Sequence, residues 1–422
     1  MKVLVGMKGK TGKYVDILSY ISIFMIKKYS LIILLVSIFS CSVMQKDLSQ
    51  IESNYSIDLD GEKEISIPLS IYFKSPKSII LETRKECLIG RIDKFYVFNG
   101  YIYAFDMNIA KSLFVFDLAG RFIRKIGNIG QGPGEFIHLL DFTLDTENKF
   151  IFLLDYGQRI HKYHLDGTFI RTITPKVQNT NINFIQYYKG KLFLSVTAYK
   201  PSTDNFLLLE ADPDDGKILK RTLPVKLNKG WGLQIRSDHS FFISRLNKPP
   251  LYNQLFMDYI VSIGEEITPY ISFKSKNLST ERDIEKLHEV ASNTKNAARG
   301  FMDFSKIWDA NIIVENDDFF LLGFQHGFGN QNYVIKHKKT DEVKLTNYLN
   351  NDLIFKQDQK GWFGKFSFFD SHGAYSVLQD ILIGTLQESI RNNEITQGLE
   401  IVDELLKLAD DSNPVILYYE YK

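Results

Sequence analysis

The chain has 422 residues, a net charge of +1 and an aromatic content of 14%. Residues 1–40 hold six lysines and one aspartate, a net +5, which leaves −4 for residues 41–422. The folded part is therefore mildly acidic with no basic stripe, and this argues against a nucleic-acid partner. A length of this kind allows two or three ordinary domains or one large one, and the many Phe and Tyr residues suit buried strands.

The first 60 residues predict that the protein is located in the cell envelope. Met25-Ile26-Lys27-Lys28 precedes the apolar run LIILLVSIFS at 31–40, the order of a secretory signal peptide. The next residue is Cys41, and IFSC at 38–41 resembles a bacterial lipobox. The resemblance implies that Cys41 becomes the lipid-modified N-terminus, anchored in the outer membrane on either its periplasmic or its cell-surface side. A short spanning helix is the alternative, but the run is shorter than the ~20 apolar residues that one needs.

These signals divide the chain into four parts. Residues 1–24 read as an upstream extension, 25–40 as the signal peptide, 41–60 as a flexible tether and 61–422 as the folded domain. If Cys41 carries lipid, Cys87 has no partner for a disulfide, and its apolar neighbours predict a buried side chain.

The folded part reads as short strands from end to end. Residues 65–73 and 77–81 read as opening strands, and KFYVFNGYIYAFD at 94–106 is a hairpin with an Asn-Gly turn. Four-stranded units are then expected at 94–126, 137–173, 182–224, 231–273, 307–349 and 353–421. Two helical interruptions are expected, an excursion at 277–305 with a helix from Glu281, and a helix near 396–409.

Glycines in turns mark a regular period along these units. They stand at Gly120, Gly167, Gly216 and Gly264, spaced by 47, 49 and 48 residues. Units of four short strands repeating at this spacing predict an all-β, six-bladed β-propeller. Closing the ring removes exposed strand edges, so we expect the opening strands and the last strand to share a blade.

Three stretches resemble the six-bladed β-propeller lipoproteins related to NHL-repeat proteins. They are FDLAGRFIRKIGNIGQGPGEF at 116–136, the lipobox at 38–41 and DDSNPVILYYEYK at 410–422. The resemblance covers about 65–422 and implies a propeller; NHL-like propellers are commonly binding modules, and some related propellers are lyases or lactonases.

The glycine-rich passage after the first unit is the first candidate site. Gly127, Gly130, Gly132 and Gly134 with Pro133 resemble a phosphate-binding loop, but Glu135-Phe136 and a strand follow where such a loop needs Lys-Ser/Thr and a helix. One interpretation is a tight passage between blades, with glycines at positive φ and Glu135 accepting backbone hydrogen bonds. The other places it at a mouth of the channel, where Glu135 contacts ligand.

Three further residues are candidates for ligand contact. His326 lies in the glycine-rich GFQHGFGN, and Trp231 and Trp362 lie where blades start or connect. Tryptophans in such places can stack on a sugar ring, although packing is the alternative. We predict no catalytic residue, metal or cofactor from the sequence.

Two functions of different class remain open. The first is a lipid-anchored binding module for a glycan, a peptide or a partner protein, with a scaffold subunit of an envelope complex as a variant. The second is a propeller enzyme of lyase or lactonase type, with its site at the central channel. Several of His138, His239, His326 and His372, pointing with nearby acids into one channel mouth, would favour the enzyme; a channel lined by aliphatics and lone aromatics would favour binding.

Overall fold

The computed structural model describes residues 51–177, 180–197, 205–233, 240–242, 248–292, 302–356, 366–396 and 400–422. Residues Ser53–Lys422 form one compact unit. The predictions made for Cys41, Trp362 and His239 lie outside the described residues.

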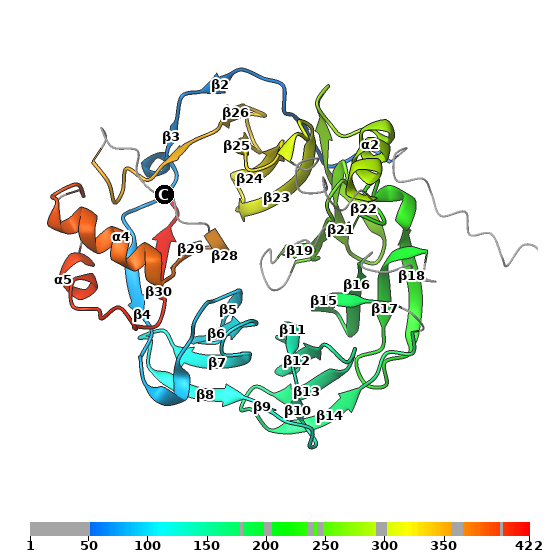
Figure 1. Ribbon diagram of the computed structural model, residues 1–422, viewed down its shortest axis with the longest axis horizontal. Coiled ribbons are helices and arrows are strands. Elements are labelled where there is room, and N and C mark those ends of the chain that lie inside the picture. The colour runs from blue at the N-terminus through cyan, green and yellow to red at the C-terminus, as the bar shows by residue number, and fades with distance from the viewer. Residues whose placement is uncertain are drawn as a thin grey trace, which may run out of the picture. The chain divides into compact units, whose positions relative to one another are not determined.

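Six blades surround a central axis, as the glycine period predicts (Figure 1). Each blade is an antiparallel sheet whose first strand lies innermost. The strands of the first three blades are β5 (Lys94–Phe98), β6 (Tyr101–Asp106), β7 (Ser112–Asp117) and β8 (Phe122–Ile126); β11 (Leu139–Asp145), β12 (Phe150–Asp155), β13 (Ile160–His164) and β14 (Phe169–Ile173); β15 (Ile182–Tyr188), β16 (Lys191–Val196), β17 (Phe206–Ala211) and β18 (Ile218–Pro224).

The remaining blades use the same plan with strands added from the N-terminal segment. Blade 4 has β19 (Phe241–Phe242), β20 (Leu251–Tyr252), β21 (Tyr259–Ile263), β22 (Ile267–Lys274) and, parallel at its edge, β1 (Tyr55–Asp58). Blade 5 has β23 (Ile307–Glu315), β24 (Phe319–His326), β25 (Gln331–His337), β26 (Val343–Thr346) and the parallel β2 (Lys63–Glu64). Blade 6 has β28 (Phe366–Phe369), β29 (Gly373–Leu378), β30 (Val415–Glu420) and β4 (Lys77–Ile80).

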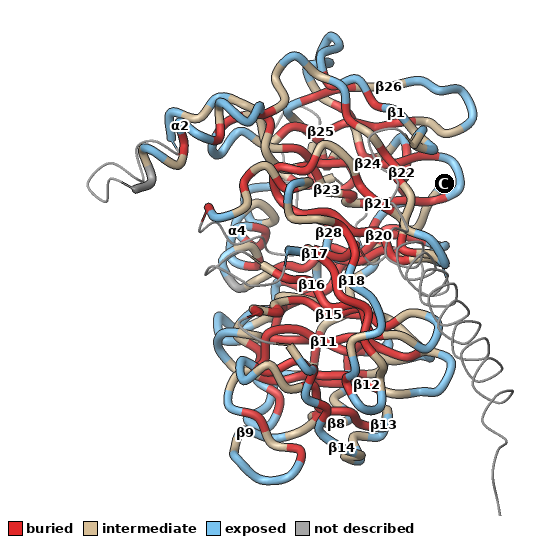
Figure 2. Tube along the Cα trace, turned by 90° about the vertical axis from the view of Figure 1, so that its right-hand side faces the viewer, coloured by how far each residue is buried: buried red, intermediate tan, exposed pale blue. Residues whose placement is uncertain are grey.

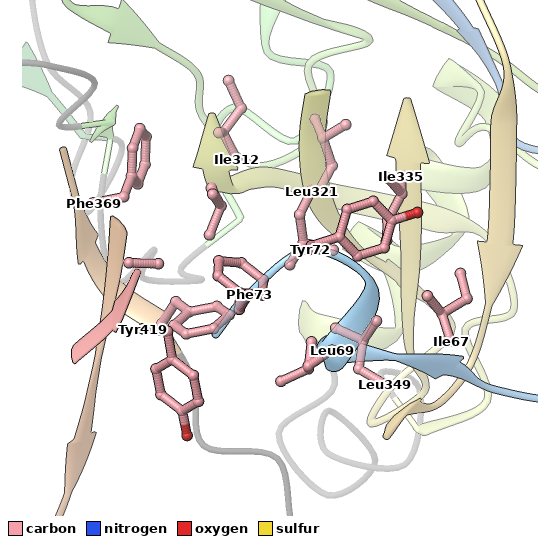
Figure 3. Close-up of a cluster of buried hydrophobic side chains, with 14 of the residues drawn as sticks. Ile67, Leu69, Tyr72, Phe73, Ile312, Leu321, Ile335, Leu349, Phe369 and Tyr419 are labelled. Atoms are coloured by element: carbon pink, nitrogen blue, oxygen red, sulfur yellow. The ribbon is translucent and has the colours of Figure 1, made fainter. Parts of the chain in front are cut away.

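The ring closes where we expected, because β4 and the C-terminal β30 share blade 6. Val415 pairs with Ile80 and Leu417 with Ser78 in an antiparallel register. Phe73 and Tyr419 pack in the core beside this junction, with Leu321 of blade 5 near them (Figure 3). Closure therefore combines backbone pairing with burial of aromatic side chains from both ends of the chain.

The propeller begins earlier than residue 61, so the expected tether is too long. β1 pairs along β22 from Tyr55 to Asp58, and Ile57 is fully buried. The opening strand expected at 65–73 is also shorter: β3 (Ile67–Pro68) pairs with β27 (Leu349–Asn350), and a single 3-10 turn follows at Leu69–Ile71. The N-terminal segment thus crosses the outer edges of blades 4 and 5 before it completes blade 6.

In the part of the chain that the structure describes, three α-helices interrupt the strands. α2 (Glu281–Ser292) begins where we predicted, with the Thr280 hydroxyl accepting from Asp283 N and the Asp283 carboxylate accepting from Thr280 N. α5 (Val402–Leu405) falls within the helix expected at 396–409 but is only one turn long. α4 (Asp380–Arg391) was not predicted; its apolar residues Ile381, Leu382 and Ile383 follow a strand directly and read as more strand. None of the helices in the described residues is long and apolar enough to cross a membrane.

Three of the four periodic glycines have a left-handed backbone. Gly120, Gly167 and Gly216 have φ of 79°, 90° and 73°, whereas Gly264 is not among the residues with positive φ. Each of the three also abuts the end of the outer strand of the preceding blade: Gly120 meets Ile80, Gly167 meets Ile126, and Gly216 meets Ile173. The three glycines at this spacing therefore each form a turn and a contact with the preceding blade.

Candidate functional site

The two ends of the propeller differ in the connections that they carry. The links from each outer strand to the next blade, and from each second strand to the third, come together at one end, which we call the loop face. Figure 2 shows three of these links, which contain α2, α4 and β9 (Asn128–Ile129), on the same side of the ring. The opposite face carries the turns between first and second strands, such as Asn99-Gly100 and Lys189-Gly190.

Every described ligand-contact candidate lies on the loop face. Glu135 belongs to the link between β8 and β11, Trp231 to the link between β18 and β19, and His326 ends β24. His372, by contrast, lies in the turn between β28 and β29, on the opposite face. His138 and His326 thus share the loop face, and His372 does not.

The carboxylate and the backbone N of Glu135 form hydrogen bonds within their own loop. Its Oε2 accepts from Gly132 N at 2.8 Å, and its backbone N donates to Gly132 O at 3.0 Å. A Cβ on Gly130 would overlap the carboxylate. Gly134 has φ of 76°, and its carbonyl accepts from the Tyr163 hydroxyl, so the loop around Pro133 is fixed to the second blade. Gly132 is not among the residues with positive φ.

Trp231 and His326 come from different blades but reach the same region. The Phe256 N donates to Trp308 O at 2.7 Å, and the Trp308 indole N donates to Gly327 O at 3.1 Å, next to His326. A Cβ on Gly230 would overlap the ring of Phe256, which places the Trp231 turn beside it. α2 covers this region, burying Ile284 and Leu287 against Leu233, Leu255 and Phe256.

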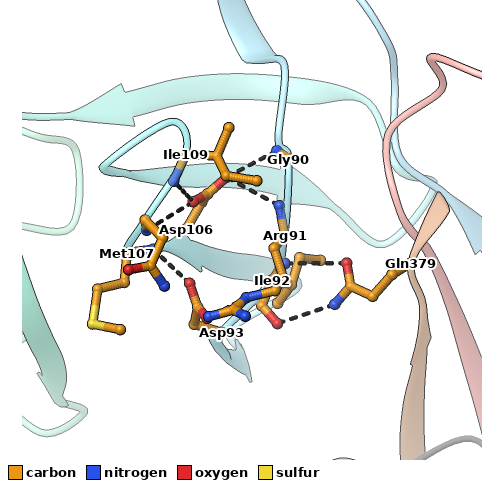
Figure 4. A network of polar contacts seen from close by, with 9 residues as sticks. Gly90, Arg91, Ile92, Asp93, Asp106, Met107, Ile109 and Gln379 are labelled. Carbon is orange, nitrogen blue, oxygen red and sulfur yellow. Dashed lines mark hydrogen bonds and ion pairs between the residues drawn. The ribbon is translucent and has the colours of Figure 1, made fainter. Parts of the chain in front are cut away.

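At the loop-face ends of blades 1 and 2, the second strand ends in a buried aspartate that accepts several hydrogen bonds. Asp106, the last residue of β6, accepts backbone N–H groups from Gly90, Arg91, Asn108 and Ile109 (Figure 4). The neighbouring Gln379 of blade 6 bonds both backbone groups of Ile92, at 3.4 and 3.2 Å. These polar groups are satisfied internally and hold the ring together.

Asp155 ends β12 at the equivalent place in blade 2. Its carboxylate accepts from His161 Nε2 at 3.1 Å and from Arg159 Nε at 3.0 Å. Burial opposes ionisation of Asp155, but these hydrogen bonds outweigh it and hold its pKa below the ordinary value. The carboxylate is therefore a structural anion under neutral conditions.

Blade 3 departs from this pattern. The residue that ends β16 is Val196, and its carbonyl accepts from Gln254 Nε2 of blade 4 at 2.8 Å. Gln254 Nε2 also donates to the Tyr252 hydroxyl at 2.7 Å, which in turn donates to Leu207 O at 3.0 Å. Burial raises the pKa of Tyr252 well above its usual range, so this hydroxyl keeps its proton. Asn228 Nδ2 completes the set by donating to Gln254 Oε1 at 3.0 Å.

We name the bonded set the blade 3–4 polar cluster: Ser195, Asn228, Tyr252 and Gln254. Within the described residues, one of its buried side-chain atoms, Asn228 Oδ1, has no hydrogen-bond partner. Trp231 lies one turn from Asn228, with its backbone N on Asn228 O at 3.0 Å. Of this cluster, the sequence analysis had identified only the neighbouring tryptophan, because the polar members come from three separate segments and share no local motif.

Exposed apolar side chains also gather in the connections of the loop face. Ile137 is 60% exposed and Tyr156 is 74% exposed, and the Tyr156 N donates to His138 O, so the two lie close together. Among the described turns of the opposite face, Leu118 in the turn between β7 and β8 is the exposed large apolar residue. The loop-face set consists of Leu88, Ile109, Ile129, Ile137, Tyr156, Met302, Phe328, Ile381 and Leu406. Among the described residues, no group of three or more His, Cys, Asp and Glu could hold a metal ion.

Comparison with known proteins agrees with this fold. Residues 54–420 match a family described as a domain of unknown function (DUF4934). A crystal structure of a Bacteroides fragilis NCTC 9343 protein, whose name assumes export, aligns with a TM-score of 0.66 and 17% identity over 87% of this chain and 99% of that one. A Bacteroides vulgatus ATCC 8482 member of the duf4221 family aligns with a TM-score of 0.49 and 11% identity, over 83% and 98%. No curated protein matches the sequence.

Proposed function

The chain belongs to the DUF4934 family, and we propose that it is a lipid-anchored binding module of the cell envelope that takes its ligand on the loop face. The observation that carries this proposal is the difference between the two faces. The long links, the excursion with α2 and most of the exposed apolar side chains share one face, while the described turns of the other are short. Loops held by a rigid scaffold commonly carry binding residues, and Ile137 and Tyr156 form an exposed apolar pair on this face.

Two observations support the proposed location in the cell envelope. Cys41 follows the signal-peptide pattern at 25–40 directly, and the compact unit begins at Ser53, twelve residues further along the sequence. The Bacteroides fragilis protein of the same fold has a name that assumes export.

The test is a ligand screen with a pair of charge variants in one blade. The full chain, purified in detergent, is screened by thermal shift against glycans, peptides and divalent ions, the ions with and without chelator. A ligand at about a hundred times its Kd stabilises a protein by roughly 2.7 kcal/mol. Ile137→Lys places a charge on the loop face, and Glu147→Lys changes the opposite face of the same blade.

The proposal predicts that a shift caused by a glycan or a peptide is reduced by Ile137→Lys or by other loop-face variants and kept by Glu147→Lys. A ligand whose effect depends only on the opposite face would contradict it. A loss of stability in chelator would indicate a metal and favour the enzyme.

A further inference from the structure

The chain has four places where Asn or Asp directly precedes glycine, and the fold gives them different reactivities. They are Asp60-Gly61, Asn99-Gly100, Asp166-Gly167 and Asp215-Gly216. In such a pair the glycine backbone N can attack the side-chain carbonyl carbon of the residue before it, because glycine has no Cβ to hinder the approach. The attack closes a succinimide ring. It requires a neutral side chain as electrophile and a glycine N–H that is not already used as a donor.

Backbone hydrogen bonds protect two of the three Asp-Gly pairs. Gly167 N donates to His164 O at 3.0 Å, and Gly216 N donates to Asp212 O at 3.1 Å. Each N–H is thus directed back along the chain by the turn that contains it. The nitrogen would have to leave this hydrogen bond before it could attack the aspartate.

The third pair, Asp60-Gly61, is protected by ionisation of its side chain. The hydrogen bond that the Ser275 hydroxyl donates is the main cause that holds the pKa of Asp60 below its ordinary value, and Lys276 N donates as well, at 2.8 Å. Asp60 is therefore ionised at neutral pH. The carbon of an ionised carboxylate resists attack by a nucleophile.

Asn99-Gly100 has neither form of protection. The pair is the tip of the hairpin between β5 and β6, on the opposite face of blade 1, beyond the last paired residues Phe98 and Tyr101. Both tip residues are exposed, with φ of 52° and 78°. Within the described residues, no hydrogen bond engages the Asn99 side chain or Gly100 N, and no atom lies within 4 Å of the Cβ position of Gly100. The tip can therefore change its dihedral angles in open space.

We propose that Asn99 is a site of spontaneous deamidation in the folded protein. Gly100 N attacks Asn99 Cγ, a C–N bond forms, and the side-chain amide nitrogen leaves as ammonia with the proton of the attacking N–H. Water then adds to either carbonyl of the succinimide and breaks one C–N bond of the ring, which gives aspartate or isoaspartate. The net reaction consumes one water and releases one ammonia, with no change of oxidation state.

The modification changes the opposite face in two ways. A neutral amide is replaced by a carboxylate, and isoaspartate also adds a methylene group to the backbone of the turn. A two-residue loop matches the twist of the paired strands only with its regular backbone, so isoaspartate should loosen the Phe98–Tyr101 end of the hairpin. The loop face lies at the other end of the blade, so this inference is independent of the proposed function.

The experiment incubates the full chain, in detergent, at mildly acidic and mildly alkaline pH. Peptide mapping by mass spectrometry then measures the replacement of NH by O at each asparagine, and an isoaspartyl methyltransferase detects isoaspartate. The matched variant is Lys189→Asn, which places an Asn-Gly pair in a turn of blade 3 with φ of 43° and 75°. Gly190 also has open space around it, but its N donates to the Tyr187 hydroxyl at 3.1 Å. Both proteins are also incubated unfolded in urea.

We expect Asn99 to be converted before the other asparagines of the folded wild type, and faster at alkaline pH because the attacking nitrogen must lose its proton. Position 189 of folded Lys189→Asn should react about tenfold more slowly than Asn99, because its nitrogen must first give up a hydrogen bond. In urea the two positions should react at similar rates. An Asn99 that stays intact in the folded protein but reacts in urea would overturn the proposal. Equal rates at positions 99 and 189 of the folded variant would overturn its basis in the free N–H.

Discussion

Gly120 lies directly against the backbone of Ile80, where the first blade meets the last. A Cβ at residue 120 would overlap the Ile80 carbonyl oxygen, and Gly120 O accepts from Glu82 N at 2.8 Å. The Glu82 carboxylate then accepts from Phe122 N at 2.8 Å. Since β4 comes from the N-terminal part of the chain, this contact joins the closing strand of the ring to blade 1.

Replacing Gly120 should therefore destabilise the ring more than an ordinary turn glycine would. We expect Gly120→Ala to lower the free energy of unfolding by about 2–4 kcal/mol, from positive φ and displaced backbone together. Gly190→Ala is the control, because Gly190 has φ of 75° but no atom within 4 Å of its Cβ position. Its expected cost is about 1 kcal/mol. Equal losses in urea titrations of the two variants would refute the contact between blades.

Lys94 and Asp141 form a buried ion pair between the inner strands of blades 1 and 2. Lys94 Nζ bonds Asp141 Oδ1 at 2.7 Å and Phe142 O at 2.8 Å, and Asp141 Oδ2 accepts from Ile185 N of blade 3. Lys94→Met should cost about 3–5 kcal/mol, because it leaves a buried carboxylate without its cation. The double variant Lys94→Met/Asp141→Asn should recover part of that loss. A double variant that is no more stable than Lys94→Met would exclude this electrostatic coupling.

The lowered pKa of Asp155 predicts a dependence of stability on acid pH. A carboxyl whose pKa is depressed by folding stabilises the protein above its unfolded pKa, near 3.9, and this is lost as pH falls through the folded pKa. The wild-type melting temperature should consequently fall more steeply below about pH 4 than that of Asp155→Asn. Asp215→Asn, in an exposed turn of blade 3, should follow the wild type. Parallel curves for the wild type and Asp155→Asn would show that Asp155 titrates normally.

Lipid attachment at Cys41 predicts where the protein is found in cells. Cys41→Ala should move the protein from the membrane fraction to the soluble fraction, because the lipid is the proposed anchor. Cys87→Ala is the matched control, since Cys87 is fully buried in the propeller and its thiol lies 3.1 Å from Glu82 O. Retention of Cys41→Ala in membranes after a high-salt wash would argue against the anchor.

The fold could be predicted because its signals are local and repeated. Short local patterns predict the turns: a glycine stands at each left-handed position, at Gly120, Gly167 and Gly216, and an Asn-Gly pair forms the turn at 99–100. α4 escaped prediction because Gln379, at its N-cap, makes no capping bond and instead uses its side chain on Ile92, far away in sequence. The pairing of β1 with β22 was equally invisible, since it joins residues more than two hundred positions apart.

The candidate site was predictable only in part. Trp231 could be identified as an aromatic at the start of a blade, and Glu135 by its glycines. Asn228 and Gln254 could not, because their hydrogen bond depends on the packing of blade 3 against blade 4 and not on any spacing in the chain. Single amides and hydroxyls in loops carry no distinguishing pattern.

The most direct test of the loop face is photo-crosslinking in living cells. A diazirine amino acid at Tyr156 places the probe on the loop face, and the same amino acid at Glu147 places it on the opposite face of the same blade. We predict that irradiation gives a discrete adduct, with glycan or polypeptide, from position 156 and none from position 147. An adduct from position 147 alone would contradict the assignment of the binding face.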